Sequence, residues 1–178
     1  KRAAAVAPGI AAAGALESWS QTSSQIPRKW DKEADVVVIG TGFAGLSAAI
    51  TAKDAGATVL ILEKMPRKHE GGNSRVSGNM WWTPTNLPEA IQYMEALSNG
   101  LTDKESIQAL AEEMMKLNDW LGTLGVKAVK LGFFQPEHPE LPGSGCVRTW
   151  SNTGAAEGKL WIPIRDQVEK RGIEVLYE

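Results

Sequence analysis

Three glycines and one glutamate are the residues of this sequence whose types and spacing best suit a defined chemistry. The glycines, Gly40, Gly42 and Gly45, have the spacing G-x-G-x-x-G, and Glu63 follows them along the chain. Such a turn at the start of a helix brings backbone N–H groups and the positive end of the helix dipole close to a pyrophosphate. A carboxylate about 20 residues later can accept hydrogen bonds from ribose hydroxyls. Together they predict a site for an adenine dinucleotide whose ribose carries no phosphate.

The elements needed to hold these residues stand on both sides of the glycines. Residues 36–39 are an apolar, β-branched run too short for a helix, which predicts a strand buried on both faces. Residues 46–54 have an alanine-rich helical pattern that stops at Gly56, a residue suited to a left-handed helix end. Residues 58–62 predict a second strand with Glu63 at its carboxyl end. The expected fold is therefore α/β, a doubly wound parallel sheet of the Rossmann-like kind.

The segment after Glu63 distinguishes between nucleotide ligands. A nicotinamide-type fold usually begins another crossover helix soon after the acidic residue. Residues 65–79 are instead polar and rich in glycine and serine, which predicts a loop. Such a loop exposes backbone N–H groups and lets the chain run close to a long ligand. The loop favours FAD. An NAD-binding dehydrogenase remains an alternative, as does a non-catalytic nucleotide-binding subunit completed by another chain.

Four short motifs resemble a known signature. Residues 40–45 read GTGFAG, residues 62–64 LEK, residues 71–74 GGNS and residues 77–80 SGNM. They are similar to the FAD-binding signature of the fumarate reductase and succinate dehydrogenase flavoprotein family, which also includes 3-ketosteroid dehydrogenases and urocanate reductase. The resemblance is dense over residues 35–80, and beyond them only the order of elements is similar. It implies a flavin-dependent oxidoreductase that transfers a hydride between FAD and a C–C single or double bond next to a carbonyl.

The same resemblance implies which residues bind the cofactor. Ala44 and Glu63 would touch the pyrophosphate and ribose, Asn73 and Ser74 the phosphate and ribityl region, and Gly78 the flavin ring. Family members with covalent flavin carry a histidine roughly where Asn73 stands, so the resemblance implies non-covalent FAD. Because the family's catalytic arginine comes from later sequence, we assign no catalytic residue. The full expected set of cofactor residues is Gly40, Gly42, Ala44, Gly45, Glu63, Lys64, Gly72, Asn73, Ser74 and Gly78.

Four other residues with reactive side chains are weaker candidates. His69 and His138 belong to the residue type that titrates near neutral pH, but exposed loop positions are the more natural interpretation of both. Arg148 could pair with a carboxylate substrate or a flavin phosphate, although a surface ion pair is the ordinary role of such a side chain. Cys146 has no base beside it in the sequence, which favours a neutral thiol over a nucleophile.

The rest of the chain predicts further elements of the same fold. Residues 89–98 and 102–122 have helical periodicity, and Thr102 and Glu105 form a T-x-x-E capping box at the start of the second helix. The remaining segments are expected to be irregular over residues 131–153, helical over residues 159–171 and extended over residues 173–177.

Composition bounds the class of protein. The 178 residues are 43% hydrophobic and 22% charged, as in ordinary soluble globular domains. The formal net charge of -2 argues against a nucleic-acid surface, which needs clustered positive charge. The single cysteine, Cys146, excludes an internal disulfide and any multi-cysteine metal or iron–sulfur site in this chain, and we expect no metal site.

Residues 1–33 are expected to be an export leader and linker, and residues 34–178 the N-terminal part of an FAD-binding domain. Residues 3–16 are weakly hydrophobic, follow two basic residues and are too few to span a bilayer. They resemble the core of a twin-arginine leader, which predicts an exported protein, with a cytoplasmic one as the alternative. Because an open sheet needs further strands to cover its edges, we expect a missing C-terminal part of the same protein. The expected partners are a small-molecule substrate and an unidentified electron donor or acceptor.

Overall fold

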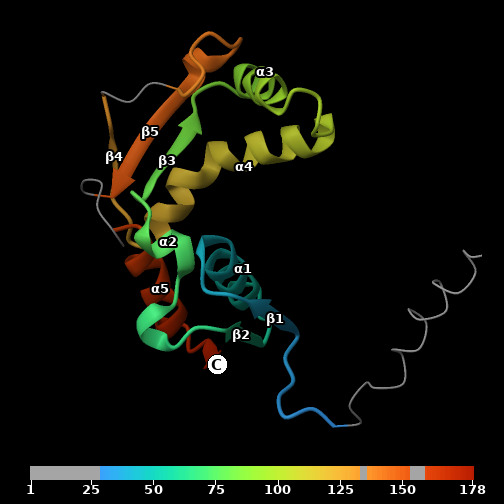
Figure 1. The fold of residues 1–178 in the computed structure, drawn as a ribbon, viewed down its shortest axis with the longest axis vertical. Coiled ribbons are helices and arrows are strands. Elements are labelled where there is room, and N and C mark those ends of the chain that lie inside the picture. The colour runs from blue at the N-terminus through green and yellow to red at the C-terminus, as the bar shows by residue number, and fades with distance from the viewer. Residues whose placement is uncertain (1–28, 133–135, 153–158) are drawn as a thin grey trace, which may run out of the picture. The chain divides into compact units, whose positions relative to one another are not determined.

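The computed structural model describes residues 29–132, 136–152 and 159–178 (Figure 1). Residues Ala34–Glu178 form one compact unit, which carries the helices and strands given below. The segment expected to be the core of an export leader lies outside the described residues. Within the part of the chain that the structure describes, no helix is both long and apolar enough to cross a membrane.

The first sheet is parallel and holds both strands predicted beside the glycines. Its order is β1 (Val36–Ile39), β2 (Val59–Glu63) and β6 (Glu174–Tyr177). Parallel neighbours need a crossover connection, and α1 (Phe43–Asp54) and α5 (Trp161–Lys170) are the helices that precede β2 and β6. The predicted parallel α/β fold is therefore confirmed, as are the helix and the strand expected near the end of the sequence.

The main core lies between this sheet and its two helices. Val38 and Ile61 are partners in the register of β1 and β2, and they share one buried cluster with Ile50 of α1. Alternate residues of a strand point to opposite faces. Val37 and Ile39 point to the other face, where they are 51% and 86% exposed. The prediction that this strand is buried on both faces is wrong, because α1 and α5 pack on the same face.

The second sheet is antiparallel. Its order is β3 (Met80–Pro84), β5 (Val147–Asn152) and β4 (Ala128–Lys130). The prediction of irregular structure over residues 131–153 is wrong for β5, which forms because it pairs with a strand far away in the sequence. In that pairing Trp82 lies opposite Thr149, and the Trp150 indole donates to the hydroxyl of Thr83 at 2.9 Å.

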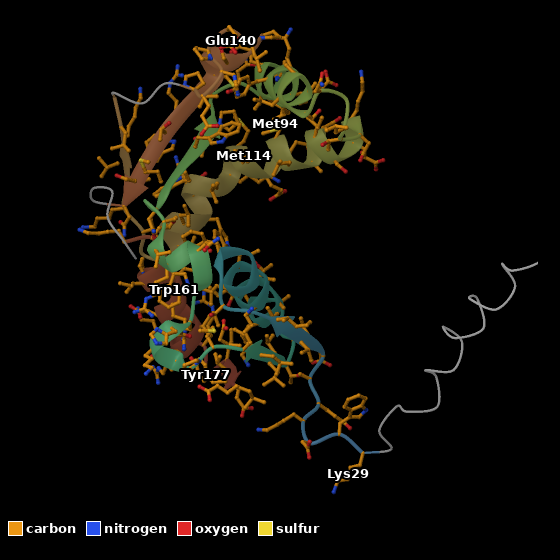
Figure 2. All side chains as sticks on the ribbon, viewed as in Figure 1. Lys29, Met94, Met114, Glu140, Trp161 and Tyr177 are labelled. Carbon is orange, nitrogen blue, oxygen red and sulfur yellow. The ribbon has the colours of Figure 1, made fainter. Side chains whose placement is uncertain are left out.

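Two helices, α3 (Leu87–Ser98) and α4 (Lys104–Thr123), lie beside the antiparallel sheet. They pack against each other and against β3 (Figure 1). A smaller apolar core there includes Met94 and Ala111, and Figure 2 labels Met94 on α3 and Met114 on α4. Both helices appear where they are predicted.

The predicted capping box of α4 is wrong. Because the helix begins at Lys104, Asp103 is the N-cap, and its Oδ1 accepts from the N–H of Ser106 at 2.8 Å. An aspartate at this position reaches the third N–H of the helix as well as a threonine would. Thr102 therefore stands one residue too early to cap the helix with Glu105.

The segment predicted as a loop over residues 65–79 is helical in two places. It contains a 3-10 turn, η3 (Arg67–His69), and a short helix, α2 (Gly72–Val76). Gly71 precedes α2 with a φ of 93°, in the left-handed region that favours glycine. A similar turn, η4 (Ser144–Cys146), comes directly before β5. The loop prediction is therefore wrong for the residues of η3 and α2, which are too few to show helical periodicity.

Candidate functional site

The turn from β1 into α1 is closed by two glycines. Gly40 has a φ of 92°, and its N–H donates to the carbonyl of Leu62 at 2.7 Å. A Cβ atom at Gly45 would lie only 2.1 Å from the carbonyl oxygen of Gly40. The strand and the helix can approach this closely only because residue 45 is glycine, which is the role that the motif predicts for it.

The first turn of α1 presents backbone N–H groups beside this turn. Gly42 is the N-cap, and the first N–H groups of a helix have no partner within it. The N–H of Phe43 donates to Oγ of Ser74 at 3.0 Å, which brings α2 against the start of α1. Ala44 is exposed next to this contact. Since the helix dipole adds positive potential here, the arrangement suits a phosphate group.

Glu63 ends β2 with its carboxylate held against the glycine turn. The residue is 8% exposed. Its Oε2 accepts from the N–H of Thr41 at 3.0 Å and from the Thr41 hydroxyl, and its Oε1 accepts from the N–H of Met65 at 2.9 Å. A carboxylate has about four acceptor positions, so these contacts leave capacity for one further donor such as a ribose hydroxyl.

The charge of Glu63 is stabilised mostly by neutral donors. Burial acts to raise the pKa of this carboxyl group, but the hydrogen bonds from Thr41 and Met65 and the charge of Lys64 outweigh burial, so the pKa lies below its ordinary value. A fixed negative acceptor suits the hydroxyls of an unphosphorylated ribose and would repel a ribose phosphate.

Thr41 and Trp161 also belong to the site, although the sequence analysis did not select them. The Thr41 hydroxyl is buried and accepts from the N–H of Gly71 at 2.8 Å while it donates to Glu63. The indole N–H of Trp161 donates to the Thr41 carbonyl at 2.8 Å. Thr41 could have been found from its place inside the glycine motif. No sequence signal indicates Trp161, because 120 residues separate the two partners.

The remaining predicted cofactor residues give an exposed surface beside this turn. Lys64, Gly72, Asn73 and Gly78 are all exposed. A Cβ atom at Gly42 would lie 3.3 Å from Oγ of Ser74, so α2 stands directly against the glycine turn. The structure thus joins the two predicted groups, the glycine turn and the segment after β2, through Ser74.

A buried ionic cluster connects the same segment to α5 and β6. Nε of Arg165 donates to Glu70 at 2.9 Å, its Nη2 donates to the Tyr177 hydroxyl at 2.9 Å, and this hydroxyl donates to Glu70 at 2.8 Å. Burial raises the pKa of Tyr177, which remains neutral and can donate. Figure 2 labels Trp161 and Tyr177, which come from α5 and β6. Since Tyr177 is the register partner of Glu63, the cluster supports the strand end that carries the site carboxylate.

The weaker candidates do not join the site. His69 and His138 are exposed, as expected, and Cys146 is completely buried, with burial raising the pKa of its thiol. Arg148 donates to two backbone carbonyls near η4. Among the described residues, no group of three or more histidine, cysteine, aspartate and glutamate side chains is arranged to hold a metal ion.

The observed geometry fits the diphosphate and adjoining ribose of FAD. The N–H of Phe43 donates to Ser74, so the N–H groups of Ala44 and Gly45 are those at the start of α1 that suit a phosphate. The carboxylate of Glu63 has one acceptor position to spare. The residues that would hold these groups are Gly42, Ala44, Ser74 and Glu63.

Comparison with known proteins identifies the family. The model of a family described as an FAD binding domain matches residues 35–159. The acrylate reductase flavoprotein subunit of Shewanella woodyi is 28% identical over 94% of this chain and 33% of its own length. A fumarate reductase (cytochrome) of Shewanella frigidimarina is 33% identical over 79% of this chain and 25% of its own length. The chain thus spans about a third and a quarter of the lengths of these two curated relatives.

A solved structure shows the same fold. The 3-ketosteroid-Δ4-(5α)-dehydrogenase of Rhodococcus jostii RHA1 matches with a TM-score of 0.70 at 23% identity, over 87% of this chain and 40% of that one. The family match contains the glycine turn, Glu63 and α2, which are the parts that the sequence motifs indicated. The resemblance to the fumarate reductase flavoproteins is therefore confirmed. This chain belongs to the FAD-binding domain family, and FAD is its cofactor.

Proposed function

We propose that the protein is an FAD-dependent oxidoreductase that moves a hydride between the flavin and a C–C bond next to a carbonyl. The observation that carries this proposal is the turn of Gly40, Gly42 and Gly45 with the ionised, hydrogen-bonded Glu63 beside it. The names of several relatives support the choice of reaction, since they describe a reductase of acrylate, a reductase of fumarate and a dehydrogenase of 3-oxosteroids. Each substrate has a carbon–carbon bond conjugated or adjacent to a carbonyl group.

The residues of this chain bind and orient the cofactor. Backbone N–H groups at the start of α1 hold the diphosphate, and the Ser74 hydroxyl stands beside them. Glu63 accepts from the adenine ribose. Lys64 and the exposed backbone at Gly72, Asn73 and Gly78 line the path toward the flavin ring. The bound flavin supplies the hydride acceptor and donor.

FAD is held non-covalently in this proposal. Asn73 stands in α2, where the resemblance to the family indicates the position of a histidine in members with covalent flavin. A carboxamide lacks the nucleophilic ring nitrogen that forms such a bond. The test is to precipitate the purified flavoprotein with acid, after which all of the yellow colour should be in the supernatant. Colour that stays in the pellet would contradict non-covalent binding.

The reaction is tested on the protein in its full natural length. We expect the purified protein to show a flavin absorption spectrum in the blue and to catalyse dye-linked turnover with at least one compound from a panel of fumarate, acrylate and a 3-oxosteroid. The matched control is Gly45→Ala protein at equal concentration, which should be colourless because the added Cβ meets the Gly40 carbonyl. A folded protein that takes up no flavin, or one that binds flavin and turns over none of the panel, would contradict the proposal.

The domain arrangement and location are part of the same proposal. Residues 34–178 form the N-terminal part of the FAD-binding domain, and residues 1–33 act as a twin-arginine export leader and linker. The basic and weakly hydrophobic start of the sequence supports export. A fusion of the N-terminal segment of the protein in its full natural length to a reporter should accumulate outside the cytoplasm only in cells with twin-arginine translocation. Export in cells without it, or no export at all, would contradict this assignment.

A further inference from the structure

We propose that Asn79 is a positioning residue that fixes the segment at the flavin ring relative to the turn at the diphosphate. The inference rests on the proposed path of FAD from the glycine turn to Gly78. Asn79 follows Gly78 directly and precedes β3. The residue is only 2% exposed, so its side chain is not solvated by water. Its contacts are instead with polar groups of the segments that surround the cofactor.

One end of the Asn79 side chain holds the flavin segment. Nδ2 donates to the Ser77 carbonyl at 2.6 Å, to the Ser74 carbonyl at 3.3 Å and to Oγ of Ser77 at 3.1 Å. These contacts close residues 74–79 into a compact unit. Ser74 is also the residue whose Oγ accepts from Phe43 at the start of α1. The unit around Gly78 is therefore attached to the first turn of the diphosphate-binding helix.

The other end of the side chain holds α5. Oδ1 of Asn79 accepts from the N–H groups of Leu160 and Trp161, both at 2.9 Å. Leu160 is the N-cap of α5 and makes no capping hydrogen bond with its own side chain. Asn79 therefore caps this helix from a position 81 residues earlier in the chain.

Trp161 completes the connection to the glycine turn. Its indole N–H donates to the Thr41 carbonyl at 2.8 Å, between Gly40 and Gly42. Its ring also packs against the backbone of Gly71, where a Cβ atom would lie 2.6 Å from the ring. The contacts thus form a closed path from Asn79 through α5 to Thr41 and back through α1 and Ser74. A shift of the flavin segment would break buried hydrogen bonds at the turn, which is costly for unpaired polar groups.

The backbone of Asn79 allows a selective test. Its φ is 53°, in the left-handed region, which glycine adopts without strain. Asn79→Gly therefore removes the side-chain hydrogen bonds and keeps the backbone conformation. Asn99 ends α3 with a φ of 48° and is exposed, so Asn99→Gly is the matched control with the same residue type and conformation away from the site.

The experiment compares FAD with ADP, which lacks the flavin. The apoprotein in its full natural length is titrated with each ligand, and the visible circular dichroism of bound flavin is recorded. We expect Asn79→Gly to weaken FAD binding about tenfold or more, to change ADP binding less than about twofold, and to alter the flavin dichroism. Asn99→Gly should match the wild-type protein in every measurement. If Asn79→Gly loses affinity for FAD and ADP equally, or loses affinity for neither, the inference is overturned.

A second variant tests the path through Trp161 and serves if Asn79→Gly does not fold. Trp161→Phe keeps a ring against Gly71 and removes the donor to Thr41. It should weaken FAD binding, and the double variant should lose little more than the worse single variant, because both act on one path. If the fold-losses of FAD affinity of the two single variants multiply in the double variant, or if Trp161→Phe binds FAD as the wild-type protein does, the two residues do not act through one path. A wild-type protein that binds neither ligand contradicts the proposed function, whereas wild-type binding with an unaffected Asn79→Gly contradicts only the role of Asn79.

Discussion

Two regions of the molecule differ in the residues that they bury. One is the parallel sheet with α1 and α5, and the other is the antiparallel sheet with α3 and α4. The first, which we call the site region, buries polar and charged side chains beside its apolar core, among them Thr41, Glu63 and Arg165. The second, the helix-pair region, has a small apolar cluster that includes Met94 and Ile107. Among the described residues it buries the hydroxyl residues Thr83 and Ser151 in its sheet but no charged side chain. Burying a polar group is costly unless it is hydrogen-bonded. Stability and cofactor binding should therefore change together in the site region and separately in the helix-pair region.

The largest expected effect is the loss of FAD affinity when Gly45, which has no room for a side chain, is replaced by alanine. In Gly45→Ala the new Cβ would lie 2.1 Å from the Gly40 carbonyl oxygen, so the turn must open. We expect FAD affinity to fall at least 100-fold, about 2.7 kcal/mol, with a lower Tm. Titration of the apoprotein with FAD measures the change.

Gly122→Ala is the control in the helix-pair region. Gly122 lies inside α4, and a Cβ there would meet nothing within 4 Å. Alanine favours a helix by up to about 1 kcal/mol over glycine, so the Tm should rise without a change in FAD affinity. Equal behaviour of the two variants would remove the distinction between the regions.

The next largest effect separates stability from binding. Met94 is 7% exposed in the core between α3 and α4 (Figure 2). Met94→Ala leaves a cavity there, and we expect unfolding in urea to show a loss of about 2 to 3 kcal/mol. The FAD dissociation constant of the folded variant should stay within about twofold of wild type. A parallel loss of FAD affinity would show that the two regions are coupled.

A smaller effect follows from the ionisation of Glu63. Its pKa is lowered in the folded protein, so its charge stabilises the fold fully above the ordinary carboxyl pKa, and this contribution is lost as the pH falls through the lower folded value. We expect wild-type Tm and FAD retention to fall on acidification below about pH 4. Glu63→Gln should be destabilised at pH 7, because one of the donors from Thr41 or Met65 then faces an amide NH₂. On acidification, the Tm and FAD retention of this variant should fall less than those of the wild-type protein.

Glu113→Gln controls for the loss of one charge. Glu113 is exposed on α4 and pairs with Lys116. Exposed pairs contribute little to stability, so this variant should keep the pH dependence of the wild-type protein. A Glu113→Gln protein with the altered pH dependence of Glu63→Gln would contradict the role of the buried carboxylate.

The smallest effect concerns the start of α4. Asp103→Ala removes the acceptor for the Ser106 N–H and should lower the Tm by a small but measurable amount. Thr102→Ala should leave the Tm unchanged, because Asp103 is the N-cap. Both variants should bind FAD as the wild-type protein does. Thermal unfolding that ranks the two variants in the opposite order would restore the capping box as the helix signal.

Local patterns were sufficient to predict the site region around the glycines. Residues 36–63 combine a β-branched run, a glycine turn, an alanine-rich helix and a second run, and each signal lies within a few residues of the structure that it specifies. The left-handed Gly56 was predicted for the same reason. The exposure of Val37 and Ile39 could not be predicted, because the composition of a strand does not reveal which face its neighbours cover.

The parts that sequence reasoning missed depend on partners far along the chain. Strand β5 contains polar residues and follows a stretch rich in proline, and only its pairing with β3 makes it extended. Trp161 and Asn79 act on the site through hydrogen bonds to Thr41 and to the start of α5, which cross 120 and 82 residues. Such contacts leave no periodicity in a single sequence, so that tertiary structure alone reveals them.

The three hydrogen bonds that hold Glu63 are formed within the protein itself. This edge of the sheet therefore does not have to order itself when the nucleotide arrives, and the entropic cost of uptake at that edge is correspondingly small. Loading then resembles docking onto a prepared surface rather than folding coupled to association. The adenosine half of the cofactor should consequently associate first, as an anchor that presents the rest of the molecule at high effective concentration.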